Sequence, residues 1–103
     1  MDSTDSAPPQ HWQRDRVGTF LVERFLVGWS ADEVTSLVQR LDAAAPQLAE
    51  HGVRHVESIV IPADETFLSL FEAPDAASVS TANRSCELPF GRVLLATTHR
   101  TAP

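Results

Sequence analysis

Residues 53–72 constrain the fold most, because their pattern predicts a β-hairpin. Two runs rich in β-branched and aromatic residues flank a Pro-Ala-Asp-Glu stretch at residues 62–65, and Pro and Asp favour turns. With these four residues as the loop, His55 lies opposite Glu72 in the paired strands. A loop of three residues would instead place the two side chains on different faces of the hairpin.

Strand alternation leaves apolar residues on both faces of this hairpin. One face carries His55, Glu57, Ile59, Ile61, Leu68, Leu70 and Glu72, and the other carries Val56, Ser58, Val60, Phe67, Ser69 and Phe71. Neither face is typical of a surface exposed to water, so we expect both to be covered. Glutamates in the middle of such strands are the feature that any account of function must explain.

The rest of the chain predicts two more strands and two helices. Ser30-Ala-Asp-Glu33 is a capping box that begins a helix, and Pro46 should disturb that helix because it cannot donate its hydrogen bond. Asp75 is a suitable N-cap for a weaker second helix. The predicted order is strand, helix, strand, strand, helix, strand, at residues 19–27, 31–50, 53–61, 66–72, 76–86 and 92–98.

This βαββαβ order predicts an α+β, ferredoxin-like fold, with a four-stranded antiparallel sheet and two helices on one face. Two helices cover only one face of such a sheet, and the strands carry apolar residues on the other face as well. We therefore expect a homodimer that packs sheet against sheet as a dimeric α/β barrel. The space between or beneath the sheets is the expected cavity for a small hydrophobic molecule.

One domain is expected at residues 19–99, between an N-terminal leader at 1–18 and a short tail at 100–103. The leader has no apolar period, which is typical of a segment that cannot bury enough surface to become ordered. His11 and Trp12 are the two residues of this leader that could contact another part of the protein. Trp12 either stays exposed in a mobile tail or docks over the mouth of a pocket.

The charge and motif content disfavour several classes of function. The net charge is −6 without a Lys/Arg cluster, so binding to nucleic acid or to an anionic membrane is not expected. No apolar run approaches the roughly 20 residues that span a bilayer. Cys86 is the only cysteine, and no CxxC, HExxH, GxSxG or Gly-rich phosphate loop occurs. The cytoplasm is the expected compartment.

Three glutamates on the strands, Glu23, Glu57 and Glu72, are the candidate functional carboxylates. A buried carboxylate needs a partner or a raised pKa, so each either pairs with Arg24, Arg54, Arg92 or His55 or lines a cavity as an acid or base. His55 opposite Glu72 would form a dyad. The carboxylate would raise the pKa of His55, whereas burial in a dry cavity would lower it.

Four stretches resemble a family of small bacterial proteins, often described as a domain of unknown function, that includes nickel-binding and nickel-responsive proteins. They are Phe20-Leu-Val-Glu-Arg24, Gly52-Val-Arg-His-Val-Glu-Ser58, Phe71-Glu-Ala-Pro-Asp75 and Leu88-Pro89. The resemblance covers Thr19 to about Thr98 and implies a ferredoxin-like, dimeric α/β barrel. Leu68, Phe71 and Ala82 stand where a Cys, a Tyr and a His are common in the family, which removes ligands that nickel favours.

Two functional hypotheses follow. In the first, the protein is a cofactor-independent cyclase or isomerase that acts on a hydrophobic metabolite, with His55, Glu57, Glu72 and Glu23 as acid–base groups. In the second, which the resemblance implies, the protein binds nickel or responds to a metal, with His55 and Glu72 as ligands.

Overall fold

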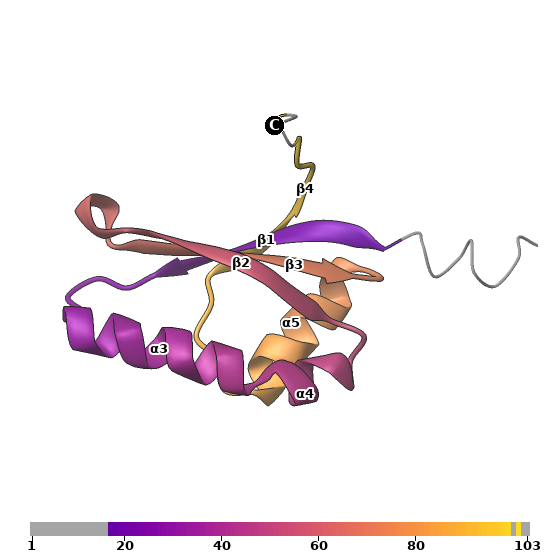
Figure 1. Ribbon diagram of the computed structural model, residues 1–103, viewed down its shortest axis with the longest axis horizontal. Helices are drawn as coiled ribbons and strands as arrows, with labels where there is room; N and C mark the ends of the chain where they lie inside the picture. Colours follow the sequence, from indigo (N-terminus) through magenta and orange to yellow (C-terminus); the bar gives the residue numbers. More distant parts are fainter. Residues whose placement is uncertain (1–16, 100, 102–103) are drawn as a thin grey trace, which may run out of the picture.

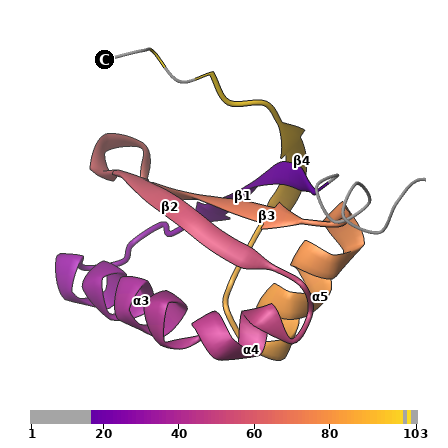
Figure 2. The same ribbon diagram turned by 45° about the vertical axis from the view of Figure 1, so that its right-hand side comes forward.

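Four antiparallel strands form one sheet in the order β2-β3-β1-β4, and the three α-helices of the described residues lie on the same side of it (Figures 1 and 2). The computed structural model describes residues 17–99 and 101. The strands are β1 (Gly18–Phe25), β2 (Arg54–Ile61), β3 (Thr66–Ala73) and β4 (Arg92–Ala96), and the helices are α3 (Ala31–Ala43), α4 (Ala45–Ala49) and α5 (Ala76–Ser85). The predicted ferredoxin-like, βαββαβ α+β fold is confirmed.

The helices begin and end where the sequence predicts. Ser30 caps α3, and both hydrogen bonds of the capping box to Glu33 are present, at 3.1 and 2.8 Å. The predicted disturbance is the boundary between α3 and α4. Pro46 lies in the first turn of α4, where a backbone N–H makes no hydrogen bond within the helix, so the lack of an N–H in proline costs nothing there. Asp75 caps α5 by accepting from the Ser78 amide at 2.8 Å.

The core lies between the sheet and the helices. Residues alternate strictly along β1 and β3, so every second side chain points towards the helices. Fully or almost fully buried side chains from both layers meet there, namely Phe20, Val22, Phe67, Phe71, Leu37, Leu41, Leu48, Val79 and Ala82. Their burial holds the two layers together and fixes which strand faces are turned inward.

A β-bulge in β2 changes the predicted register. From Glu57, opposite Leu70, to Ile61, opposite Thr66, the pairing is that of the predicted four-residue loop. The register then shifts between His55 and Glu57, so that Val56 is an extra residue. Arg54 therefore lies opposite Glu72, and the prediction that His55 lies there is wrong.

The bulge also reverses the predicted faces of two residues. Val56 and Glu57 both line a hollow on the open face of the sheet, together with Leu70 and Glu72. His55 is opposite Phe71 and points to the helix side instead. Successive side chains of a strand alternate between its two faces, so one extra residue at Val56 is enough to move the residue before it to the opposite face.

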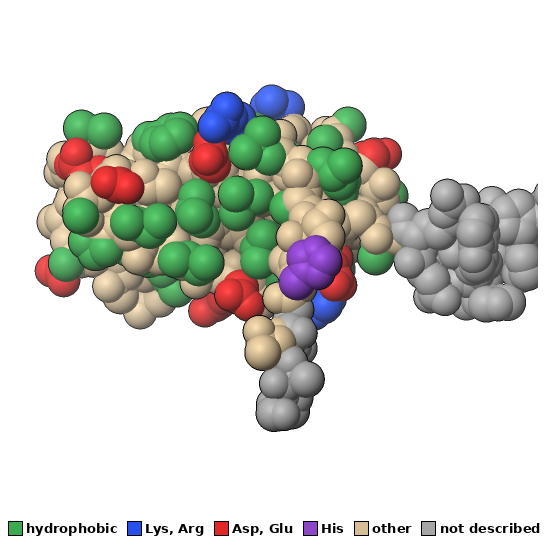
Figure 3. Space-filling view, turned by 90° about the horizontal axis from the view of Figure 1, so that it is seen from above, with side chains coloured by type: hydrophobic (Ala, Val, Ile, Leu, Met, Phe, Trp, Pro, Cys, Tyr) green, Lys and Arg blue, Asp and Glu red, His purple; other side chains and the backbone are tan. Residues whose placement is uncertain are grey.

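The open face of the sheet is largely apolar. Figure 3 shows hydrophobic side chains gathered across its middle, with charged side chains around them. Phe25 and Ile59 are 58% and 46% exposed, and the half-buried residues of this face include Leu21, Leu68, Leu70 and Leu94. In the described part of the chain, no helix is long and apolar enough to cross a membrane.

Strand β1 begins at Gly18, one residue before the predicted strand. The expectations for residues 1–16, including those for His11 and Trp12, lie outside the described residues, as do those for residues 100, 102 and 103.

Candidate functional site

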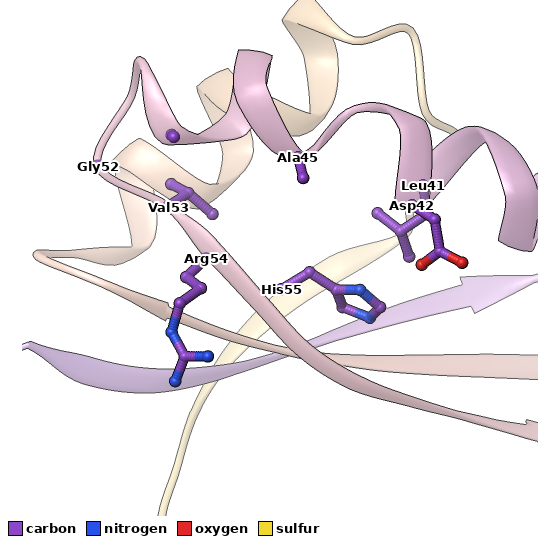
Figure 4. A pocket seen from close by; sticks show the side chains of 8 residues that line it. Leu41, Asp42, Ala45, Gly52, Val53, Arg54 and His55 are labelled. Atoms are coloured by element: carbon purple, nitrogen blue, oxygen red, sulfur yellow. The ribbon is translucent and has the colours of Figure 1, made fainter.

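His55 lines a hollow of about 450 Å³ beside the edge strand β2 (Figure 4). Its walls come from the end of α3, from α4 and from the segment that enters β2, namely Leu41, Asp42, Ala45, Ala49, Gly52, Val53, Arg54 and His55. The positive φ of Gly52, 73°, allows the sharp turn that brings α4 back onto the start of β2. The wall is therefore built by residues close in sequence.

A chain of hydrogen bonds fixes the imidazole ring. His55 Nε2 lies 2.8 Å from Ser58 Oγ, which in turn lies 3.0 Å from Ser69 Oγ. Ser69 is completely buried, and the ring also packs on Phe71 at a centroid distance of 5.3 Å. The orientation of the ring is thus determined by Ser58, which Ser69 holds in place, and by Phe71.

Ser58 and Ser69 were not predicted as site residues. The sequence nevertheless indicates them, because both serines fall on the otherwise apolar inner face of neighbouring strands and lie directly opposite each other. A buried hydroxyl requires a hydrogen-bond partner, so two such residues indicate a polar network.

Burial lowers the pKa of His55 below its ordinary value of 6.5. A backbone hydrogen bond at Glu57 and the charge of Asp42 raise the pKa, but they only partly oppose the effect of burial. The imidazole is therefore neutral at pH 7. Of the two alternatives drawn from the sequence, a raised pKa beside Glu72 is wrong, and a lowered pKa from desolvation is confirmed.

Two of the three predicted carboxylates form ion pairs across the sheet. Glu72 Oε1 lies 2.6 Å from Arg54 Nη2, and Glu23 pairs with Arg92 of β4. The Glu23 carboxylate raises the pKa of Arg92 through this hydrogen bond and through its charge. Both pairs lie on the open face and link neighbouring strands, which agrees with the structural interpretation of these glutamates.

Glu57 also lies on the open face, in a hollow of about 410 Å³ that it shares with Glu72 and His99. All three glutamates are thus on the opposite side of the sheet from His55. The proposed His55–Glu72 dyad and the corresponding pair of metal ligands cannot form within one chain. Among the described residues, no three His, Cys, Asp or Glu side chains lie close enough together to hold a metal ion.

Arg24 is a buried cation that sequence reasoning did not place correctly. Its side chain is 1% exposed and bonds to neutral acceptors, Pro89 O at 2.5 Å and Asn83 Oδ1 at 2.8 Å. Its Nε has no hydrogen-bond partner among the described residues. Burial lowers its pKa to about 10, so it remains charged at pH 7 and ties β1 to α5 and to the loop before β4.

A further hollow of about 410 Å³ lies between the start of α3 and the far end of the hairpin. Most of its wall is apolar, including Leu26, Trp29, Val34, Val38, Val60 and Ile61. Within the described residues its only carboxylate belongs to Glu65, which accepts from the Gly28 amide at 2.8 Å. Glu65 is thus bound to the backbone of the loop, and the hollow has no histidine among its lining residues, so we take the His55 hollow as the candidate site.

The fold and this hollow define a ferredoxin-like α+β protein with a histidine between sheet and helices. Among solved structures, the chain is similar to SCO4226 from Streptomyces coelicolor A3(2), with a TM-score of 0.64 and 17% sequence identity. The match covers 80% of this chain and 99% of the other, and it shows a shared fold. No family model matches the chain, and no curated protein matches it.

Proposed function

We propose that this protein binds a compact apolar molecule in the His55 hollow and uses His55 as a general base, as a cofactor-independent isomerase or cyclase does. The observation that carries the proposal is a half-buried, neutral imidazole held by Ser58 at the wall of a mostly apolar hollow. A base for catalysis near neutral pH needs an unprotonated ring in a fixed position. Glu23, Glu57 and Glu72 have no part in this step, because they lie on the other face.

Ser58 supports the acid–base cycle because a hydroxyl can both donate and accept. It can hold either tautomer of the neutral ring through Nε2. When the ring gains a proton, Nε2–H donates to Ser58 Oγ, and the Ser58 hydroxyl donates onward to Ser69. The imidazolium that forms during the reaction is therefore stabilised without movement of the side chains.

The proposal includes a homodimer through the open face of the sheet. The described helices cover only the other face, and the open face carries hydrophobic side chains gathered across its middle, with charged side chains around them (Figure 3). A second copy of the chain would bury it. The net charge of −6 disfavours nucleic acid or an anionic membrane as the partner, and a cytoplasmic location completes the proposal.

Membership of the nickel-binding family that the sequence resembles is an alternative proposal. Its support is the ordered resemblance of four sequence stretches, but the described residues do not fit a nickel site. Equilibrium dialysis against Ni²⁺, followed by elemental analysis, separates the two proposals. Nickel bound at one or more equivalents per chain would favour the alternative and would contradict a protein that works without a metal.

The general base is tested with 5-nitrobenzisoxazole, a neutral aromatic probe. A base removes its ring C–H proton, the N–O bond breaks, and the coloured cyanophenolate that forms is followed by absorbance. We expect His55→Ala to lower the rate of the native full chain by about tenfold or more. The rate should rise with pH through an apparent pKa below 6.5.

The matched control is His51→Ala, which removes a histidine four positions away that does not line the hollow. This variant should keep the native rate. Equal rates for the native chain and His55→Ala, or an equal loss in His51→Ala, would overturn the proposal.

A further inference from the structure

The His55 hollow contains one negative charge that no described residue of its wall compensates. Three ionisable side chains line it, Asp42, Arg54 and His55. Arg54 turns to Glu72 and forms a hydrogen-bonded ion pair through Nε at 3.1 Å and Nη2 at 2.6 Å. Since His55 is neutral at pH 7, Asp42 alone sets the sign of the charge that a ligand meets.

The arrangement of these side chains leaves the Asp42 carboxylate available. In Figure 4, Arg54 points away from the helices, whereas Asp42 and His55 come from opposite walls and face the same space. Among the described residues, Asp42 makes no side-chain hydrogen bond or salt bridge, and it does not pair with His55. Its charge nevertheless reaches the ring, because it acts on the pKa of His55.

The rest of the wall favours a flat, apolar molecule. Leu41 and Val53 form the buried floor, and Ala45 and Ala49 have short side chains that leave room above it. A ligand in this position would have its apolar body on these four residues. A group at its edge would lie between Asp42 and His55.

We propose that the ligand of the hollow carries a protonated amine on a compact apolar body, with Asp42 as the residue that binds the amine. This inference rests on the proposed function, since it concerns the same hollow. Asp42 accepts hydrogen bonds from the ammonium group and so positions the neighbouring carbon or hydroxyl at the His55 ring. Asp42 is a positioning residue that discriminates against carboxylates, because a second negative charge beside it is repelled.

The test compares tryptamine, indole and indole-3-acetate, which share one ring and carry a positive, no and a negative charge at pH 7. Each is titrated into the native full chain at 0.15 M salt, taken as an approximately physiological ionic strength. The Ala45 and Ala49 amide signals are followed by NMR. We expect the affinity to fall in the order tryptamine, indole, indole-3-acetate.

Two variants separate Asp42 from the overall charge of the protein. Asp42→Asn should weaken tryptamine binding by about twofold to fivefold and leave indole binding unchanged, as an exposed ion pair contributes up to about 1 kcal/mol. Asp64→Asn removes one negative charge from the η1 turn (Pro62–Asp64), outside the hollow, and should change neither.

The outcomes distinguish this inference from the proposed function. If indole binds but tryptamine binds no better, or if the two variants behave alike, the amine preference is wrong and the hollow remains a binding site. If none of the three probes shifts the Ala45 and Ala49 signals, the proposed binding function of the hollow fails, and the inference fails with it.

Discussion

Arg54, and not His55, lies opposite Glu72, and the two side chains form an ion pair at 2.6 Å. This relationship separates His55 from the glutamates of the strands. The glutamates of the strands pair with arginines or face solvent on the open side of the sheet, and His55 stands on the helix side with two serines. Acid–base chemistry at His55 therefore depends on burial and on Ser58.

The first prediction concerns the independence of His55 and Glu72. Glu72→Gln should leave the pKa of His55 unchanged, because the sheet lies between the two groups and Arg54 occupies the carboxylate. The free energy of unfolding should fall by less than about 1 kcal/mol, since the Arg54–Glu72 pair is largely exposed. An NMR titration of the His55 ring and a urea denaturation curve measure the two effects. A clear shift of the pKa in the variant would restore the dyad.

The second prediction concerns stability at acidic pH. The pKa of His55 is below 6.5 in the folded protein, so between the two values the unfolded chain binds the proton more readily. The contribution of the neutral ring is fully present above about pH 6.5 and is lost as the pH falls towards the folded pKa. The drop in urea midpoint between pH 7.5 and pH 5 should be larger for the native chain than for His55→Gln.

The control for this measurement is His51→Gln, which removes a histidine outside the network. It should show the same drop in midpoint as the native chain. If His55→Gln shows that drop as well, burial of His55 does not govern the acid sensitivity.

The third prediction concerns the open face. Leu70→Asp should convert the proposed dimer into a monomer, because it places a charge in the middle of the apolar surface. Val27→Asp is the matched control, since Val27 is 76% exposed in the loop after β1. Light scattering gives the mass of each. A native chain that is monomeric at all concentrations would remove the dimer from the proposal.

The fourth prediction concerns Arg24. Arg24→Ala should lower the free energy of unfolding by about 3 kcal/mol or more, because it leaves a cavity and removes the donors to Pro89 O and Asn83 Oδ1. Arg84→Ala should cost less than about 1 kcal/mol, since Arg84 is exposed on α5. Urea denaturation compares the two variants. An equal loss of unfolding free energy in the two variants would show that Arg24 does not stabilise the contact of β1 with α5 and with the loop before β4.

Most of the fold was readable from the sequence because its signals are local. The capping box at Ser30, the cap at Asp75 and the loop at residues 62–65 each determine their own geometry within a few residues. Alternation in β1 and β3 is unbroken, and the two faces predicted for β3 are the observed ones. Each of these features is fixed by neighbours in the chain.

The candidate site was predicted only in part, because its geometry depends on distant segments. His55 was singled out, but a bulge has no reliable sequence signal here, and one extra residue moved His55 to the other face. Arg24 was a predicted partner of the strand carboxylates. Its acceptors are instead Asn83 Oδ1 and Pro89 O, which lie 59 and 65 residues further along the chain. Such partners are determined by tertiary packing alone.

The bulge at Val56 also affects how the chain can change in length. A deletion inside a strand normally exchanges the inner and outer faces of everything beyond it. Val56 is already unpaired, so its deletion would leave Arg54 opposite Glu72 and His55 opposite Phe71 in a regular ladder. Position 56 is therefore a place where a one-residue deletion would keep His55 in its hollow.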